Sequence, residues 1–115
     1  MADLLVDTDV LIDHLRGDRR LSAEVGSIAI SVISHCELFA GHDEPERLRR
    51  FLSPMSELPI DLEIAELAGV TRRNTGIATP DALVAATALT HRLPLMTRNR
   101  HHYDRVPKLR IITPV

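Results

Sequence analysis

The sequence predicts an α/β fold in which helices cover both faces of a central, mostly parallel sheet. Two observations support this prediction. Short apolar segments rich in β-branched residues alternate along the chain with longer segments that carry helical start and stop signals. The strand-like segments are also almost entirely apolar, as strands covered on both faces should be. Strands that alternate with helices form a parallel sheet through right-handed crossovers, which gives a three-layer α/β/α arrangement.

The first half of the chain is expected to hold two strand–helix units. Apolar residues recur at helical spacing after the first strand, and a glycine follows them as a stop signal. Ser34 and Glu37 form a capping-box pattern, which indicates where the second helix begins. In chain order we expect a strand at Leu4–Val6, a helix from Asp7–Thr8 to about Gly17, a strand at Ile28–Ile33, and a helix from Ser34 to Gly41.

The second half is expected to hold three more helices and further short strands. Proline can open a helix at its first position, and aspartate is a good N-cap, so both mark helix starts here. The expected helices are Pro45–Leu52, Leu62–Thr75 capped by Asp61, and one with Thr79 as N-cap, Pro80 as N1 and Asp81 as N2 that runs to about His91. The expected strands are a weak one at Leu58–Ile60, then Leu95–Thr97 and Ile111–Ile112.

Length and composition favour one compact domain over residues 1–115, because the chain is 44% hydrophobic and 26% charged. With no basic leader and no long apolar run, we expect a cytoplasmic protein without membrane contact. Cys36 is the only cysteine, so an internal disulfide is excluded. The net charge of -2 argues against nucleic-acid binding through general basicity, and any phosphate contact has to be local.

Four polar residues lie at or near the expected strand-to-helix transitions, namely Asp7, Glu37, Asp81 and Asn99. In a parallel sheet these transitions share the carboxyl edge, where open α/β sheets bind their ligands. We therefore expect these side chains to converge, although they are far apart in the sequence. A simpler explanation exists for each acid taken alone, because the helix dipole favours Asp and Glu at helix N-termini whatever the function.

Carboxylates gathered within a few ångströms repel one another unless they bind protons or a cation neutralises them. Mg²⁺ takes oxygen ligands and keeps several waters, which leaves room for a substrate phosphate. A divalent cation held by Asp7, Glu37 and Asp81 would lower the pKa of a bound water, and this chemistry suits phosphodiester hydrolysis. Three neighbours are expected to support the site, namely Thr8, Asp9 and Thr97.

Four segments contain the candidate site residues, namely Leu5–Asp13 (LVDTDVLID), Ser34–Gly41 (SHCELFAG), Thr79–Ala88 (TPDALVAATA) and Thr97–Tyr103 (TRNRHHY). In this order they resemble the four motifs of PIN-domain ribonucleases of the VapC toxin type. The acids of the second and third motifs are Glu37 and Asp81. The resemblance covers essentially the whole chain.

This resemblance implies a PIN-like fold, endonucleolytic cleavage of RNA, and dependence on Mg²⁺ or Mn²⁺. It also implies a homodimer that is inhibited by a cognate VapB-type antitoxin, in a heterotetramer or larger assembly. One position departs from the family, because the fourth motif often supplies a further acid and this chain has Asn99 there. An amide brings no charge, so the resemblance leaves open whether one or two metal ions bind.

Two other functions fit parts of the pattern. A receiver-like signalling domain also has an acidic pocket at the carboxyl edge of an α/β sheet. Such domains resemble one another in a lysine that ends a late strand, whereas Lys108, the only lysine, precedes the last strand here. A PIN domain that binds RNA or protein without cutting is the second alternative, and the joint presence of Asp7, Glu37 and Asp81 argues for activity.

A partner is expected to use the acids as well. An arginine from the antitoxin could pair with two carboxylates, occupy the metal site and block the substrate phosphate. The antitoxin segment would need an apolar groove between the helix around Val10–Leu15 and the segment Glu37–Leu52. We expect Phe39, Leu48 and Phe51 to be free to line that groove.

Overall fold

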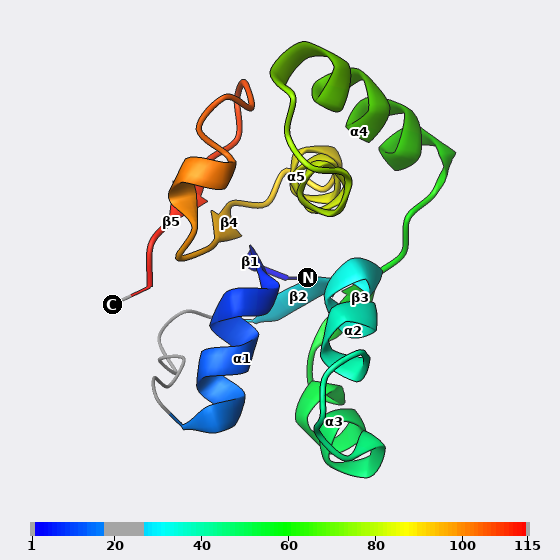
Figure 1. Cartoon of the computed structure of the whole chain (residues 1–115), viewed down its shortest axis with the longest axis vertical. Helices are drawn as coiled ribbons and strands as arrows, with labels where there is room; N and C mark the ends of the chain where they lie inside the picture. The colour runs from blue at the N-terminus through cyan, green and yellow to red at the C-terminus, as the bar shows by residue number, and fades with distance from the viewer. Residues whose placement is uncertain (1, 18–26, 115) are drawn as a thin grey trace.

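The structure is a computed structural model that describes residues 2–17 and 27–114. A five-stranded sheet with strand order β3-β2-β1-β4-β5 lies at its centre, and every neighbouring pair of strands is parallel (Figure 1). The strands are β1 (Leu4–Val6), β2 (Ile28–Ser31), β3 (Ser56–Leu58), β4 (Leu95–Met96) and β5 (Ile111–Ile112). The helices are α1 (Thr8–Arg16), α2 (Val32–Phe39), α3 (Pro45–Leu52), α4 (Leu62–Thr75), α5 (Thr79–Thr90) and the short 3₁₀ helix η2 (Arg100–His102).

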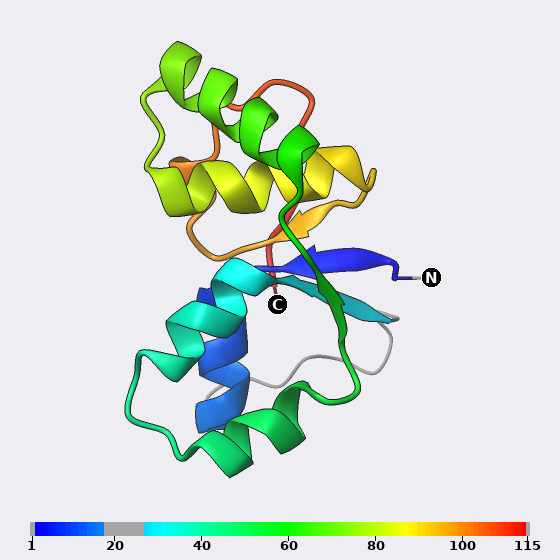
Figure 2. The same cartoon turned by 90° about the vertical axis from the view of Figure 1, so that its right-hand side faces the viewer.

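Helices cover both faces of the sheet, which confirms the three-layer α/β/α prediction. Figure 2 shows α1, α2 and α3 on one side of the strands and α4 and α5 on the other. Side chains alternate along β1 accordingly. Leu5 packs with the α4–α5 side, whereas Leu4 and Val6 pack with the α1–α3 side. Within the described residues, no helix combines the length and apolar character needed to cross a membrane.

The boundary between β2 and α2 differs from the prediction. Ser31, rather than Ser34, is the N-cap of α2, and its hydroxyl accepts a hydrogen bond from the Ile33 N–H at 3.1 Å. The β-branched residues Val32 and Ile33 therefore begin the helix instead of ending the strand. Ser34 is fully buried inside the helix. Local β propensity was overridden here because a serine cap and tertiary packing together favour the helix.

Three further boundaries shift by one or two residues. Helix α5 has Ala78 as N-cap, so Asp81 is its third residue rather than its second. Strand β3 ends at Leu58, where the prediction placed the start of a strand. Strand β4 ends at Met96, so Thr97 follows the strand directly. The predicted starts and ends of α1, α3 and α4 are confirmed, including the glycine that terminates α1 and α4.

Candidate active site

Asp7 lies where β1 ends and α1 begins, at the carboxyl edge of the sheet, and only 7% of it is exposed. Its Oδ1 accepts a hydrogen bond from the Thr8 N–H at 2.9 Å. Its Oδ2 accepts two more, from the Thr97 hydroxyl and from the Tyr103 hydroxyl, both at 2.9 Å. Three donors, one from the adjacent residue and two from a segment far along the chain, therefore hold this buried carboxylate in one orientation.

The Tyr103 hydroxyl connects Asp7 with Asp81. It lies 2.9 Å from Asp7 Oδ2 and 3.3 Å from Asp81 Oδ1, and its single proton can serve only one of them at a time. Burial raises the pKa of the Tyr103 phenol far above its ordinary value, and the two negative carboxylates raise it further. The phenol therefore stays protonated and acts as a hydrogen-bond donor between the two acids.

The charge on Asp81 is only partly compensated. Burial raises the pKa of its carboxyl above 3.8, and the negative charge of Asp7 adds to the rise. His102 and the Tyr103 hydroxyl act in the opposite direction, with the His102 Nδ1 atom 3.4 Å from Asp81 Oδ2. The charged form of Asp81 is therefore disfavoured in the folded protein, mainly by burial and further by the negative charge of Asp7.

Glu37 joins the cluster through the Thr8 hydroxyl rather than through Asp7 itself. That hydroxyl lies 2.7 Å from Glu37 Oε1 and 2.9 Å from the buried Ser34 Oγ. Because the Thr8 backbone N–H donates to Asp7, this one residue contacts both acids. Glu37 is exposed and lies in the second turn of α2, whereas the sequence placed it in the first.

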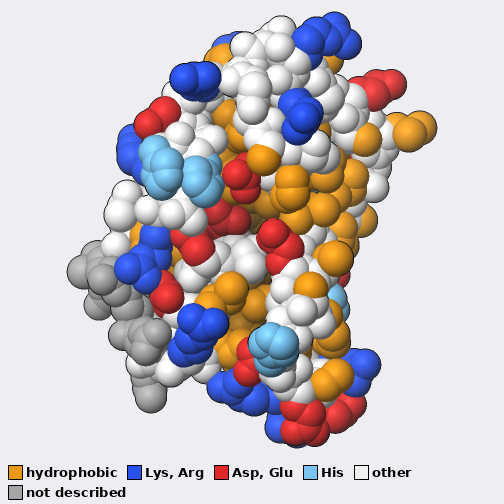
Figure 3. All heavy atoms as spheres, viewed as in Figure 1, with side chains coloured by type: hydrophobic (Ala, Val, Ile, Leu, Met, Phe, Trp, Pro, Cys, Tyr) orange, Lys and Arg blue, Asp and Glu red, His pale blue; other side chains and the backbone are white. Residues whose placement is uncertain are grey.

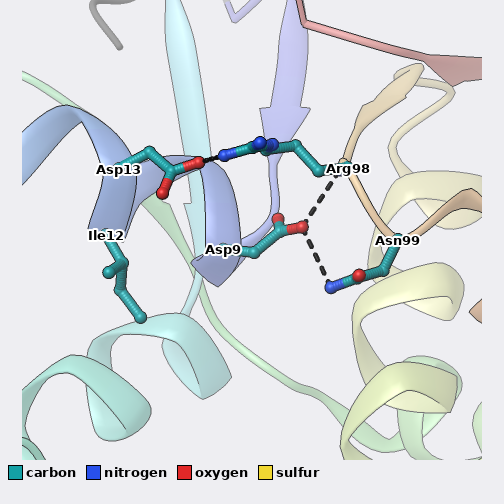
Figure 4. A pocket seen from close by; sticks show the side chains of 5 residues that line it. All are labelled: Asp9, Ile12, Asp13, Arg98 and Asn99. Atoms are coloured by element: carbon teal, nitrogen blue, oxygen red, sulfur yellow. Dashed lines mark hydrogen bonds and ion pairs between the residues drawn. The ribbon is translucent and has the colours of Figure 1, made fainter. Parts of the chain in front are cut away.

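Asp9 lies beside this cluster and is held by the residues that follow β4. Asp9 Oδ2 accepts hydrogen bonds from the Arg98 backbone N–H and from the Asn99 side-chain amide, both at 3.0 Å (Figure 4). The Arg98 guanidinium pairs with Asp13 across a cavity of about 360 Å³ that Ile12 also lines. The Asn99 side chain thus contacts Asp9, which is not one of the three predicted metal ligands.

Burial raises the pKa of the Asp9 carboxyl, and the charge of Asp7 raises it further. Hydrogen bonds from the backbone N–H groups of Arg98 and Val10 and the Arg98 charge lower it, but they do not cancel the rise. Asp7 therefore raises the pKa of two neighbouring carboxyls, Asp9 and Asp81. In the space-filling view, acidic side chains gather around a hollow in the middle of this face (Figure 3).

The donor set suits a hard divalent cation in its chemistry. All candidate ligands are carboxylate oxygens, and Mg²⁺ can be held by two carboxylates while waters complete its shell. Asp7 and Asp81, which share the Tyr103 hydroxyl, form such a pair. In residues 2–17 and 27–114, however, no group of three or more His, Cys, Asp or Glu side chains is arranged to hold a metal ion. A three-acid metal site with Glu37 stays a prediction.

Two residues of the cluster, Tyr103 and Ser34, were missed in the sequence. Tyr103, the only tyrosine, lies in the fourth motif, but its position gives no sign that its hydroxyl reaches Asp7 from η2. Ser34 was assigned as a helix cap, whereas its hydroxyl contacts Thr8. The remaining acid of this segment, Asp104, is not part of the cluster, because 59% of its side chain is exposed and its Oδ1 lies 4.0 Å from Arg100 Nε.

The expected apolar groove is only partly available. Leu48 is fully buried in the core under α1 and α2, so the prediction that it is free to contact a partner is wrong. Phe39 and Phe51 are partly buried, and each already stacks on a histidine, His35 at 4.7 Å and His14 at 5.5 Å between ring centres. Leu48 was misassigned because helix α3 turns that position toward the sheet.

Taken together, a parallel three-layer α/β sheet with clustered acids at its carboxyl edge defines the class of α/β proteins that bind ligands at this edge. The model of the PIN-domain family matches residues 4–109, and the chain belongs to that family. It is 38% identical to the ribonuclease VapC10 of Mycobacterium tuberculosis, over 93% of this chain and 90% of that protein. It is 34% identical to the ribonuclease VapC1 of Methanocaldococcus jannaschii, over 90% of this chain and 80% of that protein.

Solved structures show the same fold. A chain of a toxin–antitoxin complex from Klebsiella pneumoniae is 33% identical and has a TM-score of 0.82, with 98% of each chain covered. A chain in the DNA-bound VapBC structure from Salmonella typhimurium also has a TM-score of 0.82, but at 22% identity that likeness concerns the fold alone.

Proposed function

We propose that this chain is an endoribonuclease built as a single PIN domain, and the toxin of a VapBC-type toxin–antitoxin pair. The observation that carries the proposal is the pair of carboxylates, Asp7 and Asp81, held around the Tyr103 hydroxyl at the carboxyl edge of the sheet. The relatives named ribonuclease VapC support the activity, and the toxin–antitoxin complex at 33% identity supports the role.

Asp7 and Asp81 would hold Mg²⁺ or Mn²⁺, with Glu37 close by. When bound, such an ion lowers the pKa of a water and neutralises the charge that develops on the phosphodiester. The raised pKa of Asp81 supports this assignment, since burial and the neighbouring Asp7 leave negative charge that a cation would balance.

The chain's own residues position the reacting groups. Thr8, Thr97 and Tyr103 fix the Asp7 carboxylate by three hydrogen bonds, so that it cannot rotate away from the cluster. Glu37 accepts a hydrogen bond from Thr8 through Oε1, and no donor within the described ranges contacts its Oε2. We assign Glu37 Oε2 the role of accepting the proton of the attacking water, and Asn99 the role of orienting Asp9.

The proposed partner is a VapB-type antitoxin, and the proposed assembly is a toxin homodimer in a heterotetramer or larger complex. An antitoxin arginine inserted between Asp7 and Asp81 would compensate their charge, and it would exclude the metal and the substrate phosphate at the same time. Inhibition would then depend on the same two carboxylates as catalysis.

Asp81→Asn with chelation tests the activity. The substitution keeps the shape of the side chain and removes a ligand charge, so we expect RNA cleavage to fall by about 100-fold or more. Cleavage by the unaltered protein should stop in a chelator. Added Mg²⁺ should raise the Tm of the unaltered protein more than the Tm of Asp81→Asn.

The matched control is Asp61→Asn. Like Asp81, Asp61 lies at the N-terminal end of a helix. Its Oδ1 accepts from the Ile64 N–H at 2.9 Å, and asparagine caps helices as well as aspartate does. This variant should cleave RNA normally. Equal cleavage in the chelator, or full activity of Asp81→Asn, would contradict the metal-dependent mechanism.

A further inference from the structure

A second cavity lies at the opposite edge of the sheet from the acids. It has a volume of about 280 Å³ and lies where α5 ends and where β4 and β5 begin. Its lining residues, which we call the amino-edge pocket, are Ala88, Leu89, Arg92, Leu93, Lys108 and Arg110. Three of these six residues are cationic and none is acidic.

The positive charge of the amino-edge pocket is not balanced by the protein. Arg92, Lys108 and Arg110 are exposed, and none of them forms an ion pair in the described part of the chain. One guanidinium nitrogen of Arg110 donates to the Arg92 carbonyl oxygen at 3.1 Å, which draws the two segments together. The remaining N–H groups are free to bind an anion.

Two of the three cations occupy strained backbone positions. Arg92 has φ of 56° and Lys108 has φ of 66°, and no other non-glycine residue in the described ranges has a positive φ. Arg92 follows the C-cap of α5, and the Leu93 N–H bonds to the Ala88 carbonyl at 2.9 Å. That helix ending normally uses glycine at the left-handed position.

The helix dipole explains only part of this arrangement. Cations are favoured near the C-terminus of α5, which accounts for a basic residue close to Arg92. The dipole does not explain why Arg92 occupies a position where glycine would avoid strain. Nor does it explain why Lys108, in a separate turn, also has a positive φ. Strain that persists twice around one cavity points to a function for the two side chains.

We propose that the amino-edge pocket binds a phosphate group of the RNA strand whose cleavage takes place at the acid cluster. The inference rests on the proposed function. Arg92 follows Asp81 by eleven residues, nearly all of them in α5, so the two sites are separated by about 16 Å along the helix axis. A polymer can contact both at once, whereas the carboxylates by themselves repel it.

The charge balance of the chain supports this role. With a net charge of -2, the protein cannot hold RNA by general basicity, and its affinity has to come from local cations. Arg92 and Arg110 can each contact a phosphate through two N–H groups, and Lys108 adds a point charge. The amino-edge pocket thus supplies the attraction that the acid cluster lacks.

The first test measures binding of a labelled single-stranded RNA by fluorescence anisotropy, in a chelator that prevents cleavage. The test variant is Arg92→Gln/Lys108→Gln/Arg110→Gln. The matched control, Arg16→Gln/Arg50→Gln/Arg73→Gln, removes the same charge from exposed arginines that form no ion pair within the described residues and line neither of the two cavities above. We expect RNA affinity to fall about 10-fold in the test variant, and the slope of log K against log salt to drop by about 2.

The control variant should lose much less affinity. If both variants bind RNA equally well, the amino-edge pocket has no role in binding and the inference is overturned, while the proposed function stands. If the unaltered protein binds no RNA, both the inference and the proposed function fail. Inorganic phosphate, added at constant ionic strength, should compete with RNA for the unaltered protein but not for the test variant.

A second variant separates binding from structure. In Arg92→Gly/Lys108→Gly, glycine relieves the strain at both positive-φ positions and removes two of the three cations. We expect Tm to stay the same or rise while RNA affinity falls about 5-fold. A purely structural role for the two side chains predicts a lower Tm with unchanged RNA affinity, and that result would overturn the inference.

Discussion

The two ends of helix α5 carry opposite charge, and each is under a different kind of strain. At its N-terminal end, Asp81 faces Asp7, and burial and like charge raise the pKa of the Asp81 carboxyl. At its C-terminal end, Arg92 and Lys108 are exposed, and their cost is conformational because φ is positive. The acid end is therefore destabilised electrostatically and the basic end through its backbone.

The helix dipole favours both arrangements, since it prefers acids at the N-terminus and cations at the C-terminus. The dipole therefore does not distinguish a functional helix end from an ordinary one. The electrostatic cost at Asp81 and the backbone cost at Arg92 can be tested separately, because each cost is relieved by a different change. A bound cation would relieve the repulsion between Asp7 and Asp81, whereas a glycine in place of Arg92 would relieve the backbone strain. Three changes at the acid end test whether the two ends of α5 act independently.

The largest effect is expected from Tyr103→Phe, which removes the hydroxyl between the two acids. Asp7 loses one of its three donors in a buried site, so the free energy of unfolding should fall by about 1–3 kcal/mol without metal. RNA cleavage should fall by about 10-fold because Asp7 is less firmly oriented. Urea unfolding in a chelator and a cleavage assay measure the two effects.

RNA binding in the chelator should be unchanged in Tyr103→Phe, since the amino-edge pocket is intact. A loss of RNA affinity as large as the loss of cleavage would show that the two ends of α5 are not independent. Tyr103 is the only tyrosine and the chain has no tryptophan, so we expect the fluorescence of the unaltered protein to change when Mg²⁺ is added.

A smaller effect is expected from pH. The folded pKa of Asp81 lies above its unfolded value of 3.8, so the folded protein takes up the proton more readily. The stability that Asp81 contributes is therefore fully present below the unfolded pKa and is lost as the pH rises through the folded pKa. In a chelator, Asp81→Asn should be more stable than the unaltered protein at pH 7, and that advantage should shrink as the pH falls toward 4.

Urea unfolding of both proteins at several pH values gives this difference directly, because all other titrating groups are common to the two. The groups that face Asp81 are Asp7, His102 and Tyr103. A difference that grows as the pH falls would mean that the Asp81 carboxylate is stabilised in the fold, contrary to the raised pKa.

The smallest effect is expected from salt. Raising the salt from 0.1 M to 1 M shortens the Debye length from about 10 Å to about 3 Å, which screens the repulsion among partly buried carboxylates only slightly. In a chelator, the Tm of the unaltered protein should rise slightly relative to that of Asp81→Asn. Thermal unfolding followed by circular dichroism measures the two Tm values. If their difference does not change with salt, dissolved ions do not screen the repulsion between the carboxylates.

The sequence by itself determined which segments become strands and helices where local signals were unambiguous. Asp61 and Gly76 bound α4 as predicted, because an N-cap hydrogen bond and a left-handed glycine act within a few residues. It also placed Asp7 and Asp81 at one edge, since all transitions in a parallel sheet share that edge. Where Ser31 competed with Ser34 as the cap, local pattern alone chose the wrong serine.

Only the tertiary structure decided what those acids contact. Tyr103 reaches Asp7 across 96 residues of sequence, and this hydrogen bond depends on the path of the chain after β4, which no local periodicity records. The same holds for Lys108 and Arg92, which come from separate turns and line one cavity. Strand and helix signals act over a few residues, whereas the charge balance of a site depends on side chains that packing brings together from distant segments.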